Sequence, residues 1–246
     1  MSTRTTVLKI GGSVLTGPQA YRRAAAHIGT RLCTSPGERI VAVVSAELGV
    51  TDHLLATATG IVEQPDARTL DLLWSTGETR SAALLALSLQ ALGVRATVAN
   101  VHQAGLSSTI PGDIQVNPLR LHALLADQDV VVVPGFFARS GGDALRSLGR
   151  GGSDLSAVLL AAGIGADGCE LLKDVPGFFT QDPKRSPDAR PIPTLSFTRA
   201  LAMADDGCEL IQRQALEAAR AHALPLYVRA IGHTTGTRIH DYADDI

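Results

Sequence analysis

Several residue types that mark whole classes of protein are scarce in this sequence of 246 residues. Its three cysteines, Cys33, Cys169 and Cys208, are odd in number and widely spaced, which argues against a disulfide framework and favours reduced thiols in a cytoplasmic protein. The seven histidines never form H-x-x-x-H and never pair with cysteines at ligand spacing. The sequence therefore predicts no metal site built from its own side chains.

Long apolar runs and an excess of one charge are also missing. The opening stretch MSTRTTVLKIGGSVL is too short to span a membrane and has no cleavage signal, so we expect a soluble, cytoplasmic protein without a membrane partner. The formal net charge of -2 gives no basic field that would draw nucleic acid, and no nucleic-acid partner is expected. Any anion must be bound locally.

Lysine is the scarcest charged residue. Of 22 lysines and arginines, only Lys9, Lys173 and Lys184 are lysines. A genome rich in arginine codons explains this preference for arginine over lysine. The three lysines that remain are informative, because a guanidinium cannot replace a compact ammonium where one is needed.

Short β-branched runs alternate with Ala/Leu-rich segments of helical period. This alternation predicts an α/β fold in which helices cover both faces of a largely parallel sheet, in one domain. The expected strands are 5–10, 39–45, 96–100, 130–135 and 224–229, and the clearest helices are 68–92, 153–163 and 208–223. Two long loops are expected, 135–152 and 176–193, near strand ends where such sheets bind ligands.

The first strand ends in Lys9-Ile10-Gly11-Gly12-Ser13, followed by a helix from about Tyr21. Glycines let a backbone close on a phosphate and Lys9 adds a full charge, yet neither G-x-x-x-x-G-K-[ST] nor G-x-G-x-x-G is present. An ordinary turn after a strand explains the segment equally well.

Two further segments carry polar candidates. Ser45 and Thr51 flank a glycine turn after the second strand; they suit a carboxylate ligand, although a helix cap at Thr51 is the favoured alternative. Glu78, in a helix otherwise filled with apolar residues, is either a surface residue or directed at a substrate amine.

The most specific segment is 148–154, Leu-Gly-Arg-Gly-Gly-Ser-Asp, which opens the helix 153–163. Glycines on both sides of Arg150 free the backbone around a planar donor suited to a carboxylate or phosphate, and this favours ligand binding over a simple helix cap. The segment from Lys173 to Lys184 contains only ordinary turn dipeptides, and Phe178 and Phe179 are more often core residues than base-stacking ones.

Five segments in the same order, KIGGS, VVSAELGVTD, STGE with a following QAG, PGFF with LGRGGSD, and DVPGFFTQDP, resemble the catalytic domain of aspartate kinases in the amino acid kinase family. The resemblance implies a three-layer αβα sandwich with a substrate lobe of about residues 1–155 and a nucleotide lobe of about 156–246. It also implies ATP and Mg²⁺ as cofactors, a small acidic substrate, a role in amino acid biosynthesis and a homodimer.

The resemblance also assigns residues. The implied catalytic residues are Lys9 and Asp154; Lys173 departs from the family pattern and is added as a third catalytic candidate because it is one of only three lysines in the chain. Substrate binding is implied for Ser45, Thr51, Glu78, Phe136, Arg150, Ser153 and Asp154. Nucleotide binding is implied for Lys9, Gly11, Gly12, Ser13, Asp174, Phe179 and Lys184, and Lys173 is a candidate for it on the scarcity of lysine alone.

Three departures from the family pattern stand out. The sequence ends at Ile246, where feedback-regulated members continue into ACT domains, so no control through an ACT domain is expected. Lys173 replaces a threonine, and Glu209 replaces a lysine that is expected to contact phosphate. We expect Lys173 to compensate for Glu209; the alternative is that Lys173 faces solvent and Glu209 pairs with Arg213 on a helix surface.

The predicted reaction is attack of a substrate carboxylate on the γ-phosphorus of MgATP, which gives an acyl phosphate and ADP. Two alternatives remain. One is a kinase of the same fold that acts on another small acid or alcohol. The other is a catalytically impaired binding subunit, suggested by Glu209.

Overall fold

The computed structural model describes residues 4–108, 114–142, 144–149, 151–183 and 186–241. An eight-stranded sheet lies at its centre, in the order β10-β12-β11-β9-β1-β2-β6-β3. All neighbouring pairs in this sheet are parallel except β11 and β12. The strands are β1 (Thr5–Ile10), β2 (Arg39–Val44), β3 (Ala96–Val98), β6 (Val130–Pro134), β9 (Cys169–Lys173), β10 (Thr194–Leu195), β11 (Leu226–Ala230) and β12 (Gly236–Ile239).

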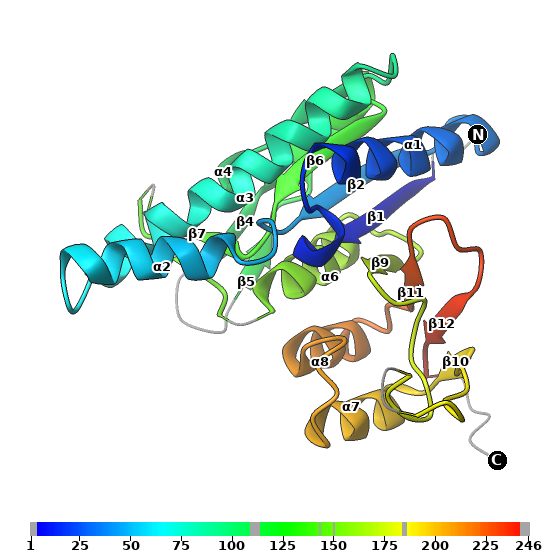
Figure 1. Cartoon of the computed structure of the whole chain (residues 1–246). Coiled ribbons are helices and arrows are strands. Elements are labelled where there is room, and N and C mark those ends of the chain that lie inside the picture. The colour runs from blue at the N-terminus through cyan, green and yellow to red at the C-terminus, as the bar shows by residue number, and fades with distance from the viewer. Residues whose placement is uncertain (1–3, 109–113, 143, 150, 184–185, 242–246) are drawn as a thin grey trace.

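Helices cover both faces of this sheet, because its inner strands carry apolar side chains on both sides. On β1, Leu8 and Ile10 pack beneath α1 (Pro18–Thr34) and α3 (Ala67–Gln90), whereas Val7 joins the core on the other face. That second core takes in α6, visible across the sheet from α1 in Figure 1. The helices that contribute buried residues to it are α4 (Val101–Ala104), α5 (Leu119–Asp127), α6 (Gly152–Gly163), α7 (Phe197–Asp205) and α8 (Arg213–Ala221).

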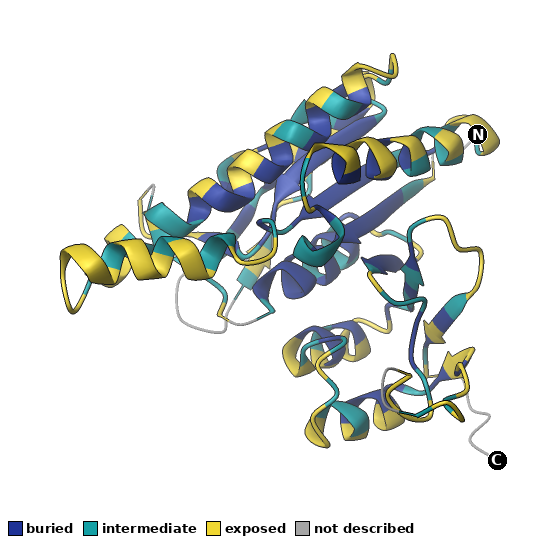
Figure 2. Cartoon of the chain, in the orientation of Figure 1, coloured by how far each residue is buried: buried dark blue, intermediate teal, exposed yellow. Residues whose placement is uncertain are grey.

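The predicted three-layer α/β sandwich with a largely parallel sheet is thus confirmed. The predicted lobe boundary near residue 155 falls inside α6, and the division into lobes stays a prediction. Helix α2 (Val50–Ile61) projects from the body and has no buried residue, as Figure 2 shows by its mostly yellow ribbon. None of the described helices is long and apolar enough to cross a membrane.

One of the two expected loops was predicted wrongly. Segment 135–152 contains an antiparallel hairpin, β7 (Phe137–Ser140) and β8 (Ala144–Ser147), within a second sheet of order β5-β4-β7-β8. The other strands of this sheet are β4 (Leu106–Ser108) and β5 (Ile114–Val116). These strands are short, partly polar and rich in serine and arginine, so no alternating pattern marks them.

The helix expected over 208–223 was also wrong. It is α8 alone, and residues 208–212 form a turn that follows α7. Gly207 separates the two helices with a φ of +93°, and the Ser196 side chain accepts a hydrogen bond from the Arg199 N–H at the start of α7. The Ala/Leu period continues across the break, which is why one helix was expected.

Candidate functional site

The order of the strands places a cleft at one edge of the sheet. From β1 the chain proceeds outward through β2 and β6 on one side, and through β9 and β11 on the other. Where the strand order reverses in this way, the connections after neighbouring strands diverge and leave a crevice at their carboxyl ends, which is where open α/β sheets bind ligands. Lys9 lies at the carboxyl end of β1, and the segments that follow β1 and β9 carry Gly11, Gly12 and Asp174.

Three charged side chains meet at this crevice. Lys9 Nζ lies 2.7 Å from Asp154 Oδ1, and Lys173 Nζ lies 2.8 Å from Asp154 Oδ2. Lys9 pairs with Leu171 in the register of β1 and β9, and Lys173, two residues further along β9, faces the same side. Asp154 projects from the first turn of α6, which covers that side. We call these residues the Lys9–Asp154–Lys173 cluster.

The cluster is almost closed to solvent. The side chains of Lys9, Asp154 and Lys173 are 6%, 4% and 13% exposed. Burial alone would raise the pKa of Asp154, but the ammonium groups of Lys9 and Lys173 lower it below its ordinary value. Burial and the charge of Lys9 lower the pKa of Lys173, although Asp154 opposes the change. With both lysines charged, the three residues of the cluster carry one positive charge in excess, and the charge of Asp174, next to Lys173, offsets part of it.

The turn after β1 packs tightly on the turn after β2. The Gly11 N–H donates to the Leu172 carbonyl at 3.2 Å, and the Leu48 N–H donates to the Gly12 carbonyl at 3.2 Å. A Cβ atom on Gly12 would overlap the Ala46 carbonyl oxygen, so only glycine allows this approach. A short 3-10 helix, Gly12–Val14, holds Ser13, and α1 starts at Pro18, earlier than predicted.

Three of the predicted substrate residues lie around α6. Ser45 Oγ and Ser153 Oγ are 2.8 Å apart, so the turn after β2 is joined to the start of α6. Phe136, the first residue after Gly135, has a φ of 74°, a left-handed conformation that is unusual for a side chain of this size and is often found at functional sites. Its N–H donates to Ser156 Oγ at 3.1 Å, and Ser156 donates to the Gly152 carbonyl at 2.7 Å. Ser156 was not predicted.

Glu78 is not a surface residue. It lies in the middle of α3 and is 3% exposed. Burial raises the pKa of its carboxyl group to about 7, although hydrogen bonds with the backbone of Ala46 and Glu78 oppose part of this rise. Among the described residues, its Oε2 atom has no hydrogen-bond partner. A buried carboxylate oxygen without a donor is suited to a cationic group of a ligand.

Thr51 does not cap α2, which was the favoured alternative for it. The residue before the helix is Gly49, in the left-handed conformation, and Thr51 is a half-buried residue of the first turn. Nearby, the Tyr21 hydroxyl donates to Glu47 at 3.0 Å and accepts from the Ser81 hydroxyl at 3.0 Å, and burial raises its pKa to about 12. Tyr21 was not predicted, because an apolar helix face conceals its hydroxyl group in the sequence.

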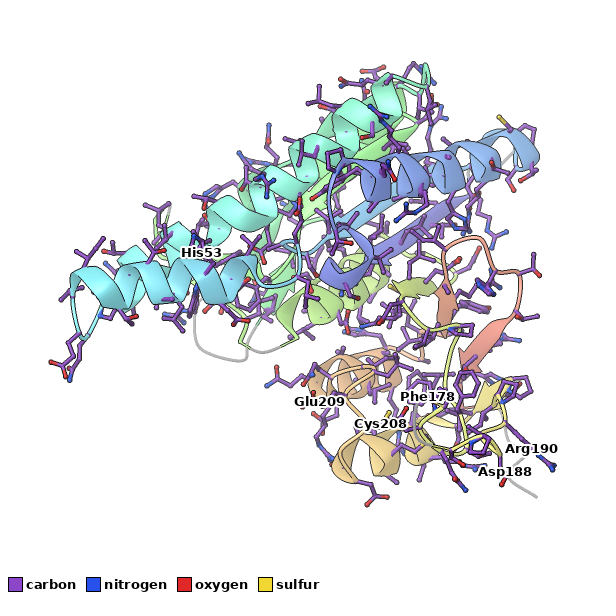
Figure 3. All side chains as sticks on the ribbon, viewed as in Figure 1. His53, Phe178, Asp188, Arg190, Cys208 and Glu209 are labelled. Atoms are coloured by element: carbon purple, nitrogen blue, oxygen red, sulfur yellow. The ribbon has the colours of Figure 1, made fainter. Side chains whose placement is uncertain are left out.

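A cavity of about 1000 Å³ is bordered by Asp174, the residue that follows Lys173 of the cluster. Residues from segments 174–183 and 203–210 line it, including Phe179, whose role in nucleotide binding stays a prediction. Phe178 is a core residue at 2% exposure that also borders the cavity. Figure 3 shows Cys208 and Glu209 in the turn between α7 and α8, on another part of the same wall.

Both parts of the alternative offered for Lys173 and Glu209 are wrong. Lys173 does not face solvent, and Arg213 contacts Asp205 and Glu217 instead of Glu209. Glu209 lies in a turn, so it has no i,i+4 relation to Arg213 on one helix. Two further predicted residues, Arg150 and Lys184, lie outside the described residues.

A second cavity, of about 900 Å³, lies near the starts of β1 and β9 and is bordered by α1. Two arginines and two glutamates pair there: Arg31 contacts Glu38 at 3.0 Å and Glu170 at 2.7 Å, and Arg229 contacts Glu170 at 3.6 Å. These pairs join the strands to α1, and we assign them a structural role. Within the described residues, no group of three histidine, cysteine or acidic side chains is placed to hold a metal ion.

The sequence model of the amino acid kinase family matches residues 4–230. The aspartokinase of Mycobacterium bovis is 38% identical over 229 residues, which are 91% of this chain and 54% of that protein. Aspartokinase 2 of Bacillus subtilis is 37% identical over 211 residues, 83% of this chain and 52% of that protein. The chain therefore spans about half the length of the curated relatives it matches.

Solved structures agree with these relatives. Aspartate kinase from Synechocystis superposes with a TM-score of 0.88 at 34% identity, over 98% of this chain and 40% of that one. Aspartokinase III from E. coli, solved in complex with aspartate and ADP, gives a TM-score of 0.80 at 22% identity over 98% of this chain and 65% of that one, and at that identity the likeness concerns the fold.

Proposed function

The chain belongs to the amino acid kinase family, and from that premise we propose that it transfers the γ-phosphoryl group of ATP to the carboxylate of a small amino acid, aspartate or an analogue. The products are an acyl phosphate and ADP. The observation that carries this proposal is the Lys9–Asp154–Lys173 cluster, with its excess positive charge, at the reversal of strand order and beside the cavity bordered by Asp174.

Phosphoryl transfer asks the protein mainly to align the reactants and to neutralise the charge on the transferring group. Lys9 is suited to this role because its ammonium is held at the carboxyl end of β1 by Asp154. The N–H groups of Gly12 and Ser13 in the turn after β1 would add partial positive charge. A carboxylate substrate is already ionised at neutral pH, so attack on phosphorus needs no general base.

The amino acid is proposed to bind between the turn after β2 and the start of α6. Ser45 and Ser153 present hydroxyl groups there, and Glu78 offers a buried carboxylate for the substrate amine. Phe136 and Thr51 would complete the walls. Arg150 is assigned to the α-carboxylate on the resemblance of its segment alone, since it lies outside the described residues.

ATP is proposed to occupy the cavity of about 1000 Å³, with its base near Phe179. Lys184 is assigned to this side by resemblance alone. Mg²⁺ is usually bound through phosphate oxygens and one or two carboxylates, and the acidic lining fits that mode: Asp174, at the end of β9, is the carboxylate nearest in sequence to the cluster. When bound, the ion would neutralise charge on the phosphates.

The test is ADP release by the purified chain with MgATP and aspartate, followed by a panel of small acids and alcohols, with Lys9→Ala as the matched control. Turnover with one amino acid that depends on Lys9 supports the proposal. Turnover with another class of acid, or with an alcohol, would show that the proposed substrate is wrong and that the kinase activity is right. Ligand-induced shifts in melting temperature without any turnover would favour a binding subunit instead. The expected homodimer remains a prediction that sedimentation velocity tests.

A further inference from the structure

We propose that Lys173 is a second catalytic cation of the phosphoryl-transfer site, which it enters from β9, and that Asp154 is the positioning residue that holds both lysines in place. The inference rests on the proposed function. It assigns to Lys173 the contact with phosphate that the family pattern leads one to expect at position 209, which Glu209 occupies in this chain.

The first argument is the balance of charge. Asp154 offers one negative charge to two ammonium groups whose side chains are only 6% and 13% exposed. Lys9 alone, at 2.7 Å, already pairs Asp154, so Lys173 is not needed for neutrality. A buried positive charge that Asp174 offsets only in part is costly unless a further counter-ion is bound, and the anion that the proposed function brings to this crevice is a phosphate.

The second argument is direction. Lys9 and Lys173 come from adjacent parallel strands, face the same side of the sheet and end on the two oxygens of one carboxylate. These two contacts fix one donor on either side of Asp154. Such preorganised charges are effective in catalysis because they need not reorganise as charge develops.

The third argument is the location of Glu209. It is exposed in the turn between α7 and α8, on the cavity wall, and no described side chain forms an ion pair with it. Lys173 therefore does not compensate by pairing with Glu209. The positive charge is instead supplied from another strand, and position 209 is left free of a phosphate contact.

The experiment compares Lys173→Met with the wild-type chain and with Lys173→Met combined with Glu209→Lys. We expect Lys173→Met to lower kcat roughly 100-fold or more, the usual effect of removing one contact to transition-state charge. Adding Glu209→Lys to this variant should then raise kcat at least tenfold, because it returns a lysine to the cavity wall. The matched control is Glu63→Lys in the same background, which reverses an exposed charge at the far end of α2 and should restore nothing.

A kcat for Lys173→Met within threefold of the wild-type value would overturn the inference and leave the proposed function intact. If the wild-type chain turns over no acid, the role of Lys173 can still be tested by measuring the binding of MgATP and of adenosine by calorimetry. Lys173→Met should weaken MgATP binding at least tenfold and leave adenosine binding unchanged, whereas equal MgATP affinities would refute the role of Lys173.

If Lys173→Met does not fold, NMR of the lysine side chains tests the proposal with Lys173 left unchanged. The chain has only three lysines, so selective ¹⁵N labelling of lysine side chains gives at most three Nζ signals, assigned with Lys9→Arg and Lys184→Arg. Titration with Mg-pyrophosphate should shift the Lys173 signal. A signal that stays in place at saturation would contradict the proposal.

Discussion

Glu78→Gln should make the ligand-free protein more stable at alkaline pH while it weakens substrate binding. Glu78 is 3% exposed, and burial raises its pKa from an ordinary value near 4.5 to about 7. The folded state therefore holds a proton over this interval that the unfolded state has released. By linkage, the free energy of unfolding falls as pH rises from 4.5 to 7, and the stability present at acid pH is lost above the folded pKa.

The size of the effect follows from the interval. Each pH unit between the two pKa values corresponds to about 1.4 kcal/mol, so full ionisation of Glu78 costs the folded protein about 3 kcal/mol. Glutamine has nearly the same shape and never ionises. The difference in the free energy of unfolding between Glu78→Gln and the wild-type chain should therefore grow in favour of the variant by about 2 to 3 kcal/mol between pH 5 and pH 8.

Urea denaturation of both proteins at several pH values measures this difference directly. Glu63→Gln, a change at an exposed carboxylate, is the control and should follow the wild-type chain at every pH. Curves for Glu78→Gln and the wild-type chain that run parallel from pH 5 to pH 8 would refute the reasoning. In the kinetic assay, Glu78→Gln should raise the KM for the amino acid because the substrate amine loses its anionic partner.

Three further predictions concern the same region. Lys9→Ala should lower kcat by a factor of about 100 to 1000 with an unchanged circular dichroism spectrum, because Lys173 still pairs Asp154; near wild-type turnover would remove Lys9 from the mechanism. Arg150→Lys should raise the KM for the amino acid more than that for ATP, since a bidentate clamp loses one hydrogen bond; equal changes in both would place Arg150 on phosphate. Gly135→Ala should destabilise the fold by about 1 to 3 kcal/mol in urea denaturation, because its Cβ atom would lie 2.8 Å from Ser153 Cβ; wild-type stability would show that α6 can shift.

Local features of the sequence were enough to predict most of the sheet and the start of α6. The buried strands β1, β2 and β6 are apolar and β-branched, and their expected bounds agree with the structure to within a residue. The glycine-rich segment at 149–152 identified Ser153 and Asp154, because the start of a helix after such a segment is a local property. The family itself followed from five short segments in order.

Contacts that join distant segments were decided only by the tertiary structure. Lys173 meets Asp154 because β9 pairs with β1, and nothing in a parallel strand's own sequence specifies its neighbour. Glu78 is buried because Gly77 lets α3 approach the turn at Ala46. The sequence determined which chemical groups this protein has available; the pairing of β9 with β1 and the packing of α6 across them decided that two lysines share one carboxylate, because charge balance depends on distances that only the folded chain sets.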